Sequence, residues 1–83
     1  MGVDLKELSP DELDLIVATR MVVDEVLGQG ISAANRAAVA RQLLPPVLSA
    51  YREARIAGLC HEGACELARD RARATAIEAR HEA

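Results

Sequence analysis

Apolar residues recur at helical spacing from residue 10 to residue 27, and this pattern predicts the first α-helix of the chain. In the segment LSPDEL, Ser9 is suited to cap the helix, Pro10 to occupy its first position, and Glu12 to complete a capping box. Gly28, in the following GQG, can adopt the left-handed conformation that closes helices. The sequence therefore predicts a helix over 10–27.

The rest of the chain predicts further helices. Ser32 is suited to cap an alanine-rich helix, and Gly58 followed by Leu59 is typical of a helix end. Pro45 and Pro46 lack backbone donors and disfavour helical geometry in the preceding residue. We therefore expect a break at 45–46, with one helix kinked at the prolines as the alternative. The pattern predicts an all-α fold, a small bundle of three to four helices at about 10–27, 33–44, 46–57 and 61–80.

The chain is short enough to form one helical domain over residues 1–83. Residues 1–8 are expected to form an N-terminal arm. Residues 78–83 are expected to fray, because the apolar face of the last helix is only alanine between Leu67 and Ile77. A domain of this size buries a modest fraction of its surface, so stabilisation by a partner is expected.

The first helix is more apolar than a surface helix needs to be. At about 100° per residue, large apolar side chains cover roughly two thirds of its circumference. Because the other helices offer few large side chains, we expect this surface to be shared with a second protein. Arg20 and Asp24, four residues apart, lie within the apolar arc, and an ion pair between them would set the alignment of the contact. The predicted contact residues are Leu15, Ile16, Arg20, Met21, Val22, Val23, Asp24 and Val26.

These observations predict a small helical protein–protein interaction module that docks through its first helix. The partner is expected to be the chain itself, in a homo-oligomer, or a larger protein of which this chain is an accessory subunit.

Composition narrows the class of protein further. Hydrophobic residues make up 51% of the chain, but there is no Phe or Trp and only one tyrosine, Tyr51, so the core must be aliphatic. With 28% charged residues and a net charge of -3, the chain is expected to be soluble and not to cross a membrane. Its N-terminus is acidic where a secretory signal would be basic and then apolar, so a cytoplasmic location with reduced cysteines is expected.

The segment GLCHEGACELA carries the strongest candidates for chemistry. A thiol at a helix N-terminus gains acidity, so Cys60 as nucleophile with His61 as base would suit a redox protein or an enzyme. His61 and Cys65, four residues apart, are the candidate metal ligands.

The same segment also reads as the start of a helix. Zinc needs at least three protein ligands, and the chain supplies only Cys60 and His81 besides these two candidate ligands. His81 would lie roughly 30 Å from His61 along one helix. A Cys60–Cys65 disulfide is excluded, because a helix would hold the two Cα atoms about 8–9 Å apart. We therefore expect no cofactor, metal or catalytic residue, and keep thiol or metal chemistry as the alternative.

A nucleic-acid-binding regulator is the third class considered. Its candidate residues are Arg69, Arg71 and Arg73, but they alternate with acidic residues in a helix that continues without a turn. The net negative charge and the lack of stacking aromatic residues argue against a nucleic-acid partner.

Overall fold

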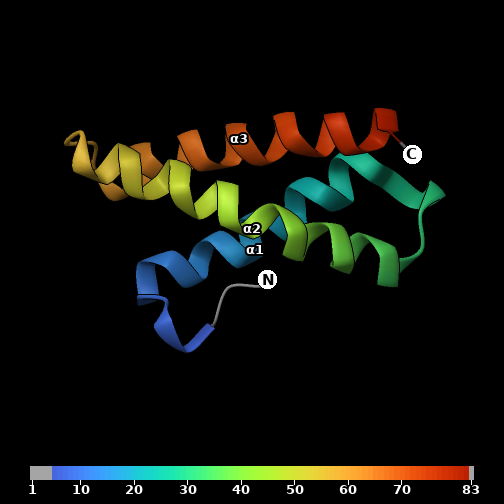
Figure 1. The fold of residues 1–83 in the computed structure, drawn as a ribbon, viewed down its shortest axis with the longest axis horizontal. Coiled ribbons are helices and arrows are strands. Elements are labelled where there is room, and N and C mark those ends of the chain that lie inside the picture. The colour runs from blue at the N-terminus through green and yellow to red at the C-terminus, as the bar shows by residue number, and fades with distance from the viewer. Residues whose placement is uncertain (1–4, 83) are drawn as a thin grey trace.

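The computed structural model describes residues 5–82, and three long α-helices account for most of them. The elements are η1 (Leu5–Glu7), α1 (Pro10–Leu27), η2 (Gly28–Gly30), α2 (Ala33–Ile56) and α3 (His61–Glu82). α2 and α3 lie side by side as an antiparallel hairpin, and α1 packs against both (Figure 1). No strand occurs among residues 5–82, so the predicted small all-α bundle is confirmed.

α1 begins and ends where the sequence predicts. The Ser9 side chain accepts a hydrogen bond from the Glu12 backbone N–H at 3.2 Å, and the Ser9 N–H donates to the Glu12 carboxylate at 3.0 Å. This is the reciprocal capping box, with Pro10 in the first turn. At the other end Gly28 has a φ of 63°, which glycine adopts without strain. The helix over 10–27 is therefore confirmed.

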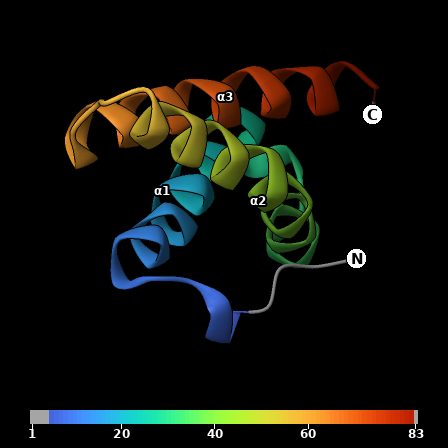
Figure 2. The same ribbon diagram turned by 60° about the vertical axis from the view of Figure 1, so that its left-hand side comes forward.

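α2 is one helix, so the predicted break at 45–46 is wrong. Pro45 and Pro46 lie inside α2, which continues to Ile56. The prolines lack a backbone N–H, so two hydrogen bonds of the helix are absent. The helix nevertheless continues, because apolar residues before and after the prolines pack into the same core. In Figure 2 the first half of α2, in green, runs in a different direction from the second half, in yellow-green. The alternative of a single helix kinked at the prolines describes α2.

The turn between α2 and α3 follows the predicted closure. The Leu59 N–H donates to the Ala54 carbonyl and the Gly58 N–H donates to the Arg55 carbonyl, both at 3.0 Å. These two bonds define a Schellman motif, and the φ of 100° at Gly58 supplies the left-handed residue that it requires. The motif turns the chain back on itself, so α3 starts beside the end of α2.

The core joins large side chains of α1 and α2 to small ones of α3. α1 contributes Leu15 and Val23, both fully buried, and α2 contributes an aliphatic row beside Tyr51. The face of α3 that meets them is a row of buried alanines at every fourth position: Ala64, Ala68, Ala72 and Ala76. Small side chains allow helices to approach closely, so few large residues are needed to cover α1.

Two predictions concern the ends of the chain. The described part of the 1–8 arm is the turn η1 followed by Leu8, which is 8% exposed and belongs to the core. α3 remains helical to Glu82, past residue 78, where fraying was expected. Residues 1–4 and residue 83 lie outside the described part of the chain. Within residues 5–82, no helix is both long and apolar enough to span a bilayer.

Candidate functional site

The predicted contact surface on α1 is only partly available to a partner. Leu15, Val22 and Val23 are at most 4% exposed, because they pack against α2 and α3 of the same chain. Their prediction as contact residues needs correction: in the folded chain they are core residues. The expectation that the chain cannot cover its own first helix overlooked how closely the alanine face of α3 lets α1 approach.

The other predicted contact residues lie nearer the surface. Ile16 and Val26 are half-buried and pack against the core. Met21 is 66% exposed, and Arg20 and Asp24 are exposed. These are the predicted contact residues that a second protein could reach.

Asp24 has a different partner from the one expected. Its carboxylate accepts a hydrogen bond from the Arg36 guanidinium of α2 at 3.0 Å. Arg36 also donates to the carbonyl oxygens of Gly28 and Ile31, so the group holds the α1–α2 connection together. Arg20 has no ion pair among the described residues. The predicted pairing of Arg20 with Asp24 is therefore replaced by a pairing within the turn.

A row of large apolar side chains remains exposed on the outward face of α1. Leu13 is 42% exposed, Val17 62% and Met21 66%. Residues four apart lie in one row along a helix, so the three form a continuous stripe, here called the α1 ridge. Of these three, only Met21 was among the predicted contact residues. The four-residue spacing was the available signal, but the wide apolar arc of α1 concealed which side would face outward.

His61 is the centre of a polar cluster at the start of α3. Its Nδ1 shares a hydrogen bond of 2.8 Å with the Tyr51 hydroxyl, and the two rings meet edge to face. The Cys65 sulfur lies 3.6 Å from Nε2, and the Asp14 carboxylate of α1 lies 3.7 Å from the same nitrogen. The structure thus brings His61 and Cys65 together and adds two partners that the sequence did not indicate.

The cysteines of this segment occupy different environments. Cys60 is exposed, and its sulfur accepts the Gly63 backbone N–H at 3.5 Å as the cap of α3. Cys65 is buried, and this burial raises the pKa of its thiol. A buried thiol with a raised pKa is a poor nucleophile. Among the side chains that the structure describes, no three from His, Cys, Asp or Glu come together to hold a metal ion.

The burial of Tyr51, aided by the charge of Asp11, raises the pKa of its hydroxyl. The hydroxyl therefore stays protonated at neutral pH and remains a hydrogen-bond partner for His61. The cluster ties the end of α2 to the start of α3, which is a structural role.

The three candidate arginines do not form one track. Arg73 donates to the Glu25 carboxylate of α1 at 3.4 Å, whereas Arg71 lies on the side of α3 that faces α2. Arg69 is exposed. Because Arg71 lies on a different side of α3 from Arg69 and Arg73, which are four residues apart, the three do not present a single phosphate-binding surface.

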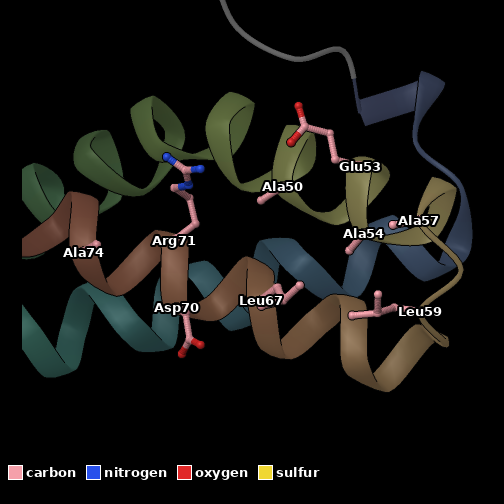
Figure 3. A pocket seen from close by; sticks show the side chains of 9 residues that line it. All are labelled: Ala50, Glu53, Ala54, Ala57, Leu59, Leu67, Asp70, Arg71 and Ala74. Carbon is pink, nitrogen blue, oxygen red and sulfur yellow. The ribbon is translucent and has the colours of Figure 1, made fainter.

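A groove of about 540 Å³ runs between the second half of α2 and the first half of α3 (Figure 3). Alanines from both helices line it, with Leu59 and Leu67 as its large apolar side chains. Glu53, Asp70 and Arg71 supply its charged groups. The lining residues, here called the α2–α3 groove, are Ala50, Glu53, Ala54, Ala57, Leu59, Leu67, Asp70, Arg71 and Ala74. Sequence reasoning missed this surface, although its residues recur at three- and four-residue spacing on both helices.

The fold and these surfaces define a three-helix bundle with an apolar ridge and an apolar groove. No protein-family model, curated protein or solved structure matches the chain in comparisons with known proteins.

Proposed function

We propose that this protein is a small helical interaction module that binds another protein through the outward face of α1. The single observation that carries the proposal is the α1 ridge, in which Leu13, Val17 and Met21 stand in one exposed row. Apolar helix residues spaced in this way are the side chains that helix–helix contacts bury. The proposal keeps the first helix as the docking element and moves the contact to residues that the bundle leaves uncovered.

The size of the ridge indicates a weak or transient contact. Full burial of an aliphatic side chain is worth about 1.5–3 kcal/mol, and the ridge side chains are already partly covered. The ridge therefore contributes a few kcal/mol, and rim contacts must add to it to offset the loss of free motion on binding. This suits an accessory subunit or a reversible oligomer. A cytoplasmic location, expected from the sequence, is part of the same proposal.

Thiol chemistry at Cys60, His61 and Cys65 is less well supported. His61 is engaged by Tyr51, and Cys65 is buried with a raised pKa. Neither side chain is poised to activate the exposed Cys60.

Photo-crosslinking in the cells that make the protein tests the proposal. A photoreactive residue at position 17 samples the ridge, and one at position 34, exposed in the first turn of α2, is the matched control. We expect a product from position 17, identified by mass spectrometry as one protein, that Met21→Glu removes. The absence of a product from position 17, or the same products from both positions, would contradict the proposal.

A further inference from the structure

The ridge and the groove are complementary surfaces carried by one chain. We propose that the α1 ridge of one copy inserts into the α2–α3 groove of a second copy, so that chains associate head to tail. This inference rests on the proposed function and names the partner as the chain itself.

The shapes of the two surfaces fit helix packing. Rows of side chains four apart on one helix pack into the grooves between rows on its neighbours. The ridge is such a row, with Leu13, Val17 and Met21 all exposed by 42% or more. The groove provides the matching hollow, because alanines from both α2 and α3 line it and leave about 540 Å³ of open volume.

The walls of the groove are also apolar where the ridge would enter. Leu67 is 47% exposed on α3, and the half-buried Leu59 lies at the end of the groove where the two helices join. Figure 3 shows Leu67 on α3, among the other residues that line the groove. A helix seated there would cover both leucines together with its own ridge.

A chain cannot fill its own groove. The buried face of α1 packs against the α2–α3 hairpin, and the ridge lies on the opposite face of the same helix. No residue of α1 lines the groove. The ridge that fills a groove must therefore come from another molecule.

Both surfaces carry charges of both signs: Arg71 lines the groove with Glu53 and Asp70, and exposed Asp14 and Asp24 flank the ridge with Arg20. Arg20 is exposed next to the ridge and has no ion pair among the described residues. Glu53 and Asp70 are exposed at the groove and also have no ion pair with any side chain that the structure describes. An inserted ridge would bring the guanidinium of one copy to these carboxylates of the next. Such rim charges align a contact more than they strengthen it.

Head-to-tail insertion predicts a particular kind of assembly. The two contact surfaces are different, so a pair of chains still has one free ridge and one free groove. Further copies can therefore add. Growth stops when a ring closes; in an open assembly, the protein concentration sets the average number of copies. A two-fold dimer that joins ridge to ridge would instead stop at two copies.

Two variants that each block one surface test this arrangement. Val17→Glu places a carboxylate on the ridge, and Ala74→Glu places one in the groove at an exposed position. Ile56→Glu and Ala34→Glu are the matched controls, because these positions are exposed and lie outside both surfaces. Circular dichroism establishes that each variant is folded. Met21→Glu and Leu67→Glu replace either blocking variant that does not fold.

Sedimentation velocity from about 10 µM to about 1 mM gives the readout, a range suited to a small interface. We expect the mass of the wild type to rise with concentration, and each blocking variant to shift its dissociation constant by about tenfold or more. The control variants should follow the wild type.

Mixing the two blocking variants is the decisive experiment. The Val17→Glu chain keeps its groove and the Ala74→Glu chain keeps its ridge, so the mixture should form one-to-one pairs and nothing larger. A mixture that stays monomeric, or an Ala74→Glu chain that associates like the wild type, would overturn the proposal.

A monomeric wild type over the whole range would also overturn it. If position 17 crosslinks to a different protein in cells while the purified chain stays monomeric, the head-to-tail arrangement fails and the proposed function stands.

Discussion

The Arg52 guanidinium of α2 donates a hydrogen bond to the Glu12 carboxylate at the start of α1, across 40 residues of sequence. The same carboxylate accepts the backbone N–H of Ser9 in the capping box. One side chain therefore closes the first turn of α1 and joins that turn to α2. The hydrogen bond from Arg52 and the bond from Ser9 hold the pKa of Glu12 below its ordinary value.

This relationship predicts how stability depends on pH. The folded pKa of Glu12 lies below the unfolded pKa, so its contribution is complete above the unfolded value, near 4.5, and is lost as the pH falls through the folded value. Glu12→Gln removes the charge but keeps a side chain that can complete a capping box. We expect the free energy of unfolding of the variant to fall less steeply than that of the wild type between pH 5 and pH 3.

Urea unfolding followed by circular dichroism at several pH values measures this difference. Glu66→Gln, at an exposed position on α3, is the control and should keep the wild-type slope. Equal slopes for Glu12→Gln and the wild type would contradict the assignment.

The buried hydroxyl of Thr19 leads to a second prediction. Thr19 is 2% exposed, and its hydroxyl oxygen has no hydrogen-bond partner in the described part of the chain. A buried polar group without a partner costs about 1–3 kcal/mol, so Thr19→Val should raise the free energy of unfolding by about 1 kcal/mol. Thr19→Ser keeps the hydroxyl and removes a methyl group, and should lower it. Thermal or urea unfolding distinguishes the two, and a less stable Thr19→Val protein would contradict the prediction.

Two glycines at the α2–α3 connection should respond in opposite directions to alanine. Gly58 has a φ of 100°, a conformation that side chains disfavour, so Gly58→Ala should lower the free energy of unfolding by about 1–2 kcal/mol. Gly63 lies in the first turns of α3, where an added Cβ would make an ordinary 3.5 Å contact with Leu59. Gly63→Ala should therefore raise the free energy of unfolding by about 0.5–1 kcal/mol. Chemical unfolding measures both, and a change of the same sign in the two variants would refute this account.

The two cysteines should differ in reactivity toward thiol reagents. Cys60 is exposed, whereas Cys65 is buried with a raised pKa. In the Cys60→Ser variant only Cys65 remains, and we expect its thiol to react at least about tenfold more slowly than Cys60 does in the Cys65→Ser variant. Denaturant should abolish the difference. Similar rates in the folded proteins would show that Cys65 is accessible.

Local signals in the sequence predicted the helix ends well. The Ser9 and Ser32 caps and the Gly58–Leu59 closure depend on residues within a few positions of each other, so a single segment contains all the information. The two prolines were misjudged for the opposite reason. Their local preference opposes a helix, but packing of both halves of α2 into one core outweighs it.

The candidate surfaces depended on contacts between distant segments, which the sequence pattern does not contain. Tyr51 and His61 meet only because the Schellman turn aligns α2 with α3. The ridge could be identified only after the structure had shown which face of α1 packs against α2 and α3. The prediction considered only large side chains as cover for α1 and neglected the alanines of α3. For this reason it assigned Leu15, Val22 and Val23 to a contact with a second protein.

The alanine row of α3 also affects the entropy of folding. An alanine side chain has no rotamers, so its burial costs none of the side-chain conformational entropy that longer residues lose. Ala64, Ala68, Ala72 and Ala76 thus bring α3 against the bundle without immobilising a single χ angle of their own. For a chain with so little interior, this lowers the entropic cost of forming the contact.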